Sequence, residues 1–538
     1  MKKIIWLLLL IYQSIQAQTI IKSETKLVVG IIVDQMKYDY VFRYWDKLGN
    51  DGFKRLMQHG YFLNEAYYNY APTITGPGHA SVYTGTTPAT HGIISNDWYE
   101  KQSKQSMYCV QDNNHRAVGA MPGDTLNNMS PNNLLVTTIG DELHISNNFK
   151  NKVIGVAIKD RGAILPAGRS ANAAYWWDWK SKNFITSTYY MQALPNWVKE
   201  FNAQKLPDTY FKEGWKLKNA GSSYSSSTAD NTPYEGLFKG EKAPVFPHLI
   251  ADSNTIDALK FMPQGNDLTL QFAMAAINNE NLGNNGLTDM ITISFSSTDY
   301  AGHRYGTHAV EIEDMYIKLD ENIHTLIDFL ERKIGKDKIL LFLTADHAAI
   351  PNAQYLADHH INAGYFNFKQ FASALRADVQ LNHGDSNLIE KFDNDMIYIN
   401  RSLLKNKNQL NDVTATIYDF CLHYKGISHA LTAAQIQNNV YTEGAKSLMQ
   451  KGFHTQKCGD LVYQLDAGLV EYGKTGTTHG SAYPYDTHVP VWFYGSKVAP
   501  GVCNRKTSIT DIAPTICNLL QIERPNGCTG VAIPEVLK

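Results

Sequence analysis

The chain has 538 residues, a formal net charge of −2 from mixed positive and negative side chains, and 43% hydrophobic and 11% aromatic residues. This composition is typical of a packed globular protein, and the length allows several domains or one large α/β core that carries insertions. The near-neutral charge gives no reason to expect nucleic acid or an anionic membrane surface as the main partner.

Residues 1–17 have the layout of a secretory signal peptide, in which two lysines precede an apolar run at 4–11 and polar residues follow up to Ala17. The apolar run is too short to span a bilayer, and no later segment is long and apolar enough to do so. We therefore expect cleavage after Ala17 and an exported, periplasmic or secreted chain over 18–538. The six cysteines fit an oxidising compartment, where pairs of them could form disulfides, and their spacing matches no zinc finger.

Continuous apolar runs predict strands that are buried on both faces, at 27–33, 152–158, 290–296, 338–343 and 489–494. Helical patterns lie between them, as at 310–334, where apolar residues recur at helical spacing. Strands that alternate with helices predict an α/β fold with a mostly parallel central sheet and helices on both faces. In such sheets, ligands bind at the carboxyl ends of the strands.

Charged and metal-binding residue types finish one predicted strand after another, namely Asp34, Lys159 with Arg161, Asp299 with His303, and Asp346 with His347. Carboxylates and imidazoles are the donors that suit zinc and similar divalent ions. The carboxylates and imidazoles among these residues are one donor short of the six that would give each of two metals three protein ligands. His479, ahead of the last predicted strand, offers the sixth. Each aspartate alone could be a helix cap and each histidine a structural residue, but these six carboxylates and imidazoles together indicate a metal site.

Two other clusters compete for a metal, one at residues 358–360 (Asp-His-His) and one formed by His423 and His429. Both lie away from the ends of the core strands, so we give them low weight. They fall within the second of two long segments, 176–255 and 351–474, that interrupt the core pattern. Long segments between core elements often form lids, so we expect both insertions to form a cap over the site.

The best candidate nucleophile is Thr75, within the stretch from Tyr70 to Tyr99. It is followed by Gly-Pro-Gly and a helical pattern, which predicts an exposed hydroxyl on a tight turn at a helix N-terminus. Such an end suits a phosphate or sulfate, although the hydroxyl needs a base or a metal to activate it. Alone, the motif is also a good ordinary turn.

These motifs together resemble the alkaline phosphatase superfamily, and within it the bacterial phosphate-irrepressible alkaline phosphatases that use threonine. The matching pieces occur in the family's order over nearly the whole mature chain: Asp34 at a strand end, TGPGHAS, HGIISNDWY with Asn96, KDRGA, STDYAGH, TADHA and THGSAYPYDTHVP. The resemblance implies a broad-specificity phosphate monoester hydrolase with two zinc ions, acting on small phosphate monoesters. It also implies a covalent phosphothreonine at Thr75.

The resemblance further implies a division of the ligands, with one zinc ion held by Asp299, His303 and His479, and the other by Asp34, Asp346, His347 and the Thr75 hydroxyl. His488 lies in the same motif as His479, but His479 directly precedes the glycine of the family's His-Gly pattern and is preferred. Lys159 and Arg161, two apart on a predicted extended segment, would point the same way and bind the phosphate oxygens, with Asn96 as a further donor.

Three rival functions remain. A sulfatase of this fold needs a cysteine or serine in a Cys/Ser-x-Pro-x-Arg motif, which the Thr75 motif is not. A nucleotide pyrophosphatase or phosphodiesterase of the same superfamily also uses threonine, but the pair of Lys159 and Arg161 favours the more highly charged monoester. An exported carbohydrate- or protein-binding module would explain the aromatic first insertion and would leave the metal-binding residues without a purpose.

Overall fold

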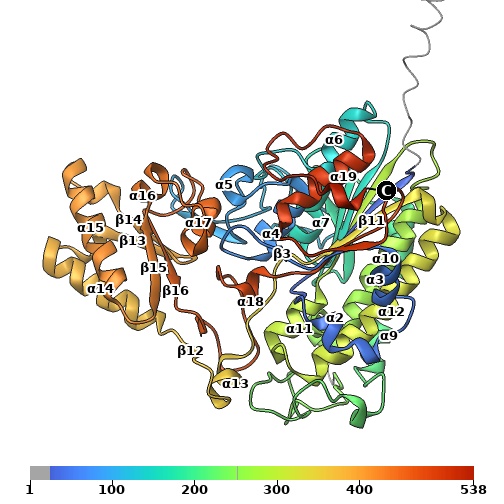
Figure 1. Cartoon of the computed structure of the whole chain (residues 1–538), viewed down its shortest axis with the longest axis horizontal. Helices are drawn as coiled ribbons and strands as arrows, with labels where there is room; N and C mark the ends of the chain where they lie inside the picture. Colours follow the sequence, from blue (N-terminus) through green and yellow to red (C-terminus); the bar gives the residue numbers. More distant parts are fainter. Residues whose placement is uncertain (1–24, 251–252, 538) are drawn as a thin grey trace, which may run out of the picture.

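The computed structural model describes residues 25–250 and 253–537, so the signal peptide predicted at 1–17 lies outside the described residues. Figure 1 shows a large core built around a twisted sheet and a smaller lobe to its left. None of the described helices is long and apolar enough to cross a membrane. All six cysteines lie in the described part of the chain, and no two of them are bonded to each other.

The core sheet has ten strands among the described residues, and its centre is parallel. The parallel strands lie in the order β11 (Ile339–Thr344), β1 (Leu27–Val33), β10 (Asp289–Phe295), β7 (Val153–Ala157) and β8 (Ala173–Asp178). Every residue of β1, β7, β10 and β11 is buried, as the continuous apolar runs predict.

Both edges of the sheet depart from the parallel pattern. On one side lie β18 (Val491–Gly495), β2 (Tyr61–Leu63) and β19 (Gly501–Cys503), and on the other β9 (Asn183–Ser187) and β6 (Ala117–Val118). The last strand predicted from sequence, β18, runs antiparallel to β11. The chain leaves β11 at its carboxyl end, passes through the lobe and returns to the sheet at that same end of the strands. The next strand, β18, therefore runs in the opposite direction to β11.

Helices cover both faces of this sheet, which confirms the predicted fold class (Figure 1). One face carries α4 (Thr75–Thr84), α6 (Ile139–Ser146), α7 (Asp160–Ala167) and α19 (Ile512–Leu520), and the other carries α3 (Phe53–His59), α10 (Pro263–Asn279) and α12 (Val310–Lys333). Helix α12 has two glutamates in its first turn and Arg332 and Lys333 in its last, which complements the helix dipole.

The segment 351–474 contains a second sheet with its own buried core. Its strands lie in the order β13 (Ile389–Asp393), β14 (Met396–Ile399), β16 (Leu461–Leu465) and β15 (Ile427–Thr432). Helices α14 (Phe368–His383) and α15 (Lys407–His423) pack on it around a cluster that includes Phe371, Ile417 and Tyr463. We call this part the lobe.

The other predicted insertion, 176–255, begins inside the core sheet, because β8 and β9 are two of its strands. Beyond β9 come α8 (Asn196–Ala203) and α9 (Leu206–Glu213), and then loops that pack on the start of α12. The indole of Trp215 and the hydroxyl of Tyr224 donate to the buried Asp314 of that helix at 2.6 and 2.5 Å. A buried indole and phenol need such partners, and this fixes the segment against α12.

Gly155 in β7 allows α7 to approach the sheet. A Cβ at this position would lie 2.1 Å from the backbone oxygen of Ala163. We expect Gly155→Ala to lower the free energy of unfolding by about 1–3 kcal/mol, because the clash is with backbone that cannot rotate away. Gly473→Ala is the matched control, since no atom lies within 4 Å of its Cβ position. Urea unfolding that gives equal midpoints for the two variants would contradict this account.

Candidate active site

Three buried carboxylates meet where neighbouring parallel strands end. Asp34 directly follows β1, Asp346 follows β11, and Asp299 lies in the first turn of α11 (Ser297–Tyr305), which follows β10. Their exposed fractions are 0%, 0% and 2%. Because β11, β1 and β10 are adjacent and parallel, their carboxyl ends share one edge of the sheet. The structure thus brings together the carboxylates predicted from sequence.

Lys159, the residue before α7, supplies one positive charge to this group. Its Nζ donates to Asp34 Oδ2 at 2.7 Å and to Asp299 Oδ2 at 2.5 Å. Burial acts to lower the pKa of Lys159, but Asp299 and Asp34 outweigh it and raise that pKa. One ammonium does not balance three carboxylates, and burial together with Asp346 raises the pKa of Asp34 well above its ordinary value.

Three histidines face the same carboxylates in one tautomer. The Nδ1 atoms of His303, His347 and His479 lie 2.8, 3.0 and 2.7 Å from backbone oxygens. Because a carbonyl only accepts, each Nδ1 carries a hydrogen, and in the neutral ring Nε2 then presents a lone pair. Those Nε2 atoms lie 3.2 Å from Asp299 Oδ1, 3.6 Å from Asp34 Oδ1 and 3.7 Å from Asp299 Oδ1, respectively.

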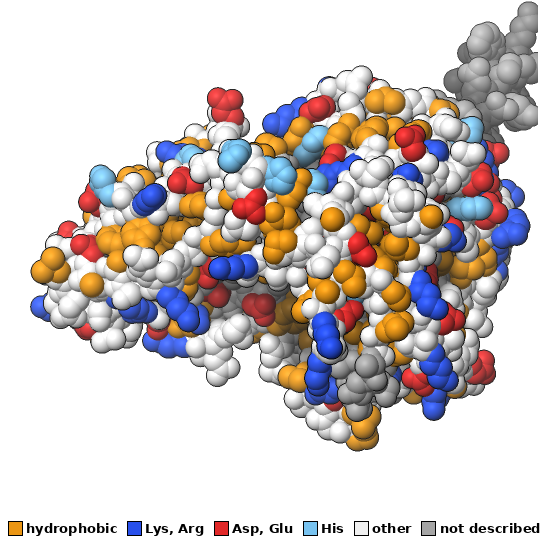
Figure 2. Space-filling view, turned by 90° about the horizontal axis from the view of Figure 1, so that it is seen from below, with side chains coloured by type: hydrophobic (Ala, Val, Ile, Leu, Met, Phe, Trp, Pro, Cys, Tyr) orange, Lys and Arg blue, Asp and Glu red, His pale blue; other side chains and the backbone are white. Residues whose placement is uncertain are grey.

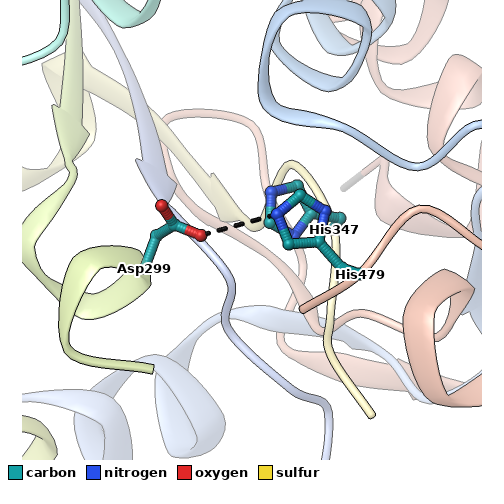
Figure 3. A group of neighbouring side chains, drawn as sticks. All are labelled: Asp299, His347 and His479. Atoms are coloured by element: carbon teal, nitrogen blue, oxygen red, sulfur yellow. Dashed lines mark ion pairs between the residues drawn. The ribbon is translucent and has the colours of Figure 1, made fainter. Parts of the chain in front are cut away.

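Neutral imidazoles that face carboxylates are donors that suit a divalent cation between them, so this donor set fits a divalent metal. Ligand atoms lie within 4.8 Å of one another in two groups, Asp34 with Asp346 and His347, and Asp299 with His347 and His479. Figure 3 shows Asp299 pointing toward the rings of His347 and His479, which stack with centroids 3.5 Å apart. Within the described chain, Asp34 Oδ1 and Asp346 Oδ2 have no hydrogen-bond partner.

His488 lies elsewhere. Its Nε2 is 3.1 Å from the backbone oxygen of Asn64, and its ring stacks between Tyr38 and Tyr67 with centroid distances of 4.1 and 4.4 Å. Among the described residues, neither of the competing clusters, at 358–360 and at His423 with His429, forms a group of side chains that could hold a metal ion.

Thr75 is the first residue of α4 and lies beside the cluster. Its Oγ1 is 3.5 Å from His347 Nε2. The side chain was predicted to be exposed, but Thr75 is only 1% exposed, because α4 is buried along its whole length. Gly78 allows the close approach of α4 to the metal-binding residues, since a Cβ there would lie 2.3 Å from the backbone oxygen of Asp346.

Asn96 is held against the helix by its carbonyl. Its Oδ1 accepts from the backbone N–H of Gly76 at 2.8 Å, so its NH₂ group remains as a donor. The lobe fixes the neighbouring chain through the two-residue turn between β13 and β14. There, Asn394 accepts from Ser95 Oγ at 2.8 Å and donates to the backbone oxygen of Asp97 at 2.7 Å.

Arg161 lies in the first turn of α7, so the pair with Lys159 is not on an extended segment as predicted. The two side chains have different partners, and Arg161 Nη1 donates to Tyr108 Oη at 3.0 Å. The same hydroxyl donates to Asp160 Oδ1 at 2.5 Å. Tyr108 and Asp160 therefore hold the guanidinium beside the site.

Sequence reasoning missed two residues that contact the carboxylates. Gln35 donates from its backbone to Asp346 Oδ1 at 3.1 Å and from its side chain to Asp299 Oδ1 at 2.7 Å. His79 Nδ1 lies 2.9 Å from the backbone oxygen of Thr75 and 3.3 Å from Asp346 Oδ2. The spacing of His79, one helical turn after Thr75, was the available signal.

The fold and the site define an α/β protein with a buried carboxylate–imidazole cluster that could hold metal, beside a helix N-terminus. Residues 28–490 match the family described as type I phosphodiesterase / nucleotide pyrophosphatase, and the chain belongs to this family. It is thereby a member of the alkaline phosphatase superfamily, as its motifs indicate.

Its relatives match along nearly their whole length. The chain is 42% identical to a protein of Myroides odoratus named calcium-transporting ATPase (96% of this chain, 95% of the relative). It is 40% identical to the alkaline phosphatase PhoV of Synechococcus elongatus (98% and 95%) and 38% identical to the alkaline phosphatase PafA of Elizabethkingia meningoseptica (95% and 94%). The crystal structure of an alkaline phosphatase PafA superposes with a TM-score of 0.92 at 36% identity, covering 97% of this chain and 100% of that one.

The two histidines of the last motif provide a test of the site. We expect His479→Ala to weaken binding of divalent metal by more than about 10-fold. Loss of a residue that only hydrogen-bonds to a metal ligand typically lowers metal affinity at least about 10-fold, and loss of a ligand itself should cost more. His488→Ala should leave metal content unchanged, since that ring packs between tyrosines. Elemental analysis after dialysis measures both. Equal losses, or a loss only in His488→Ala, would overturn the choice of His479.

Proposed function

We propose that this chain is a zinc-dependent phosphate monoester hydrolase, a broad-specificity alkaline phosphatase that works through a phosphothreonine at Thr75. One observation carries the proposal, namely that the Thr75 hydroxyl sits at the N-terminus of α4, 3.5 Å from His347 Nε2 within the carboxylate–imidazole cluster. Two of the relatives are named alkaline phosphatases, which supports the same activity. The pattern of residues 1–17 supports export to the periplasm or beyond.

Six side chains and the nucleophile would hold two zinc ions, with one at Asp299, His303 and His479 and the other at Asp34, Asp346, His347 and Thr75. Two observations support this set. Asp34 Oδ1 and Asp346 Oδ2 have no hydrogen-bond partner in the described chain, and the three histidines each bond a backbone oxygen through Nδ1. When bound, two such ions lower the pKa of a hydroxyl or water and offset charge that develops on the oxygens in line with phosphorus.

The remaining residues bind and orient the phosphoryl group. Its negative oxygens suit the positive end of the α4 dipole, the NH₂ group of Asn96 and the cations of Lys159 and Arg161. Arg161 Nε has no hydrogen-bond partner in the described chain, so this N–H is available to an oxygen. A solved variant of PafA carries substitutions at one threonine, one asparagine, one lysine and one arginine, the same four residue types.

The reaction then proceeds in two displacements at phosphorus. Thr75 Oγ1 forms a bond to phosphorus while the bond to the ester oxygen breaks and the alcohol leaves with a proton. Water then attacks the phosphothreonine and releases inorganic phosphate, which restores the hydroxyl. The donors around the phosphate hold its oxygens in place through both steps, so the chain contributes mainly positioning and charge.

Replacing the nucleophile should stop the reaction. We expect Thr75→Ala to lower kcat at least about 10³-fold, because alanine lacks the hydroxyl that forms the covalent bond. Bound metal should persist, since six other ligands remain. Thr84→Ala is the control at the other end of α4, where the hydroxyl only bonds the backbone oxygen of Ala80 at 2.8 Å. A phosphorylated peptide containing Thr75, trapped at low pH, supports the mechanism, and substantial turnover by Thr75→Ala refutes it.

Arg161 should distinguish a monoesterase from a diesterase. A monoester presents three charged oxygens and a diester two, so Arg161→Ala should reduce kcat/KM for aryl phosphate by about 1.5–3 kcal/mol and for bis-aryl phosphate by less. Arg169→Ala is the matched control, because that guanidinium bonds the backbone oxygens of Asn132 and Leu134. Equal losses on both substrates, or a wild-type preference for diesters, would assign the chain to the phosphodiesterase branch. ATP belongs in the same assay, given the name of the Myroides relative.

A further inference from the structure

A cavity of about 380 Å³ lies between the core and the lobe. Its core wall includes Ile74, Ile350 and His479, and its lobe wall includes Phe392 and Tyr463. Small-molecule sites commonly have volumes of about 300–1,000 Å³, so this cavity has the size of a binding site. Figure 2 shows a hollow on this face between the lobe and the core, with acidic side chains near it.

The cavity shares a wall with the active site. Ile74 directly precedes Thr75, and His479 reaches from this wall to within 3.7 Å of Asp299. Thr73 Oγ1 donates to the backbone oxygen of Ser481 at 2.9 Å, which joins the segment before Thr75 to the segment after His479 along this wall. A phosphate held at Thr75 would therefore have this cavity as the neighbouring space for its ester group.

The cavity is acidic. Four carboxylates line it, those of Asp393, Asp395, Glu471 and Asp486. The described residues that line the cavity include no lysine or arginine. Asp486 is only 2% exposed. Its Oδ2 accepts from the N–H and hydroxyl of Ser481 at 2.8 and 2.6 Å, while Oδ1 has no hydrogen-bond partner within the described chain. Lys37, whose charge acts on Asp486, donates to the backbone oxygen of Ala349 and does not line the cavity.

Asp395 and Glu471 both line this space, and their like charges repel each other. Burial, followed by the charge of Glu471, raises the pKa of Asp395 to about 7. A positive group between them would remove that repulsion. Aromatic rings complete the lining, from Phe368, Phe392, Tyr463 and Tyr485. Aromatic faces beside carboxylates are the combination that recognises ammonium groups, including quaternary ones.

We propose that this cavity binds a positively charged leaving group, so that the preferred substrates are phosphate monoesters of amino alcohols, including quaternary ammonium alcohols. This inference rests on the proposed function, because it assigns the substrate class of the same site. The four carboxylates would also repel anionic leaving groups, such as those that carry a second phosphate or a carboxylate. The phosphate end of the substrate stays with Lys159, Arg161 and Asn96.

Two substrates of the same shape test the charge. Phosphocholine and 3,3-dimethylbutyl phosphate differ chiefly in the positive nitrogen, and we expect wild type to favour phosphocholine about tenfold in kcat/KM. The double variant Asp395→Asn with Glu471→Gln should bring that ratio close to one. Asparagine suits position 395 because its backbone has a φ of 55°, which asparagine tolerates. Asp419→Asn, in α15 and 76% exposed in its side chain, should keep the wild-type ratio.

Calorimetry of choline binding to the full chain separates the two proposals. We expect wild type and Asp419→Asn to bind choline with equal affinity, and the double variant to bind it about tenfold more weakly. Hydrolysis of simple aryl phosphates without choline binding, and with a substrate ratio near one in wild type, would overturn the cation site and leave the proposed function standing. Choline binding without hydrolysis of any phosphate monoester would overturn the proposed function instead.

Discussion

The concentration of buried negative charge at the ends of β1, β10 and β11 is the constraint on which the rest of the site depends. Asp34, Asp299 and Asp346 are almost fully excluded from water, and among the described residues only Lys159 donates an ammonium to them. Buried carboxylates are costly unless they are paired and hydrogen-bonded. Their neighbours therefore supply donors, as Gln35 does to two of the three, and the site as a whole requires added positive charge.

Much of this arrangement could be predicted from the sequence, because the prediction does not require the order of the strands in the sheet. Strands that are buried on both faces read as continuous apolar runs, and in parallel sheets their carboxyl ends share an edge. Asp34, Asp299 and Asp346 could thus be grouped without knowing that their strands are neighbours. His479 was harder to place, because it lies on an irregular loop and was chosen over His488 by motif alone.

Other features could not be read from the sequence, for physical reasons. The direction of β18 depends on where the chain returns from the lobe, which a local apolar pattern does not encode. The first insertion was placed too early, because the aromatic residues of β8 resemble a binding loop as much as a strand. The contacts of Gln35 and His79 with the carboxylates are made only in three dimensions, and isolated polar residues carry no periodic signal.

The bonds between Thr73 and the His479 segment also determine when the site can form. His479 Nδ1 pairs with the backbone oxygen of Thr73 across 406 residues of sequence, and Thr73 Oγ1 pairs with Ser481 across 408. Closing so long a loop costs conformational entropy before any contact forms. During synthesis from the N-terminus, the nucleophile segment therefore exists long before the segment that completes its surroundings. The active site can assemble only when nearly the whole chain is available to fold, which ties its activity to a late stage of maturation.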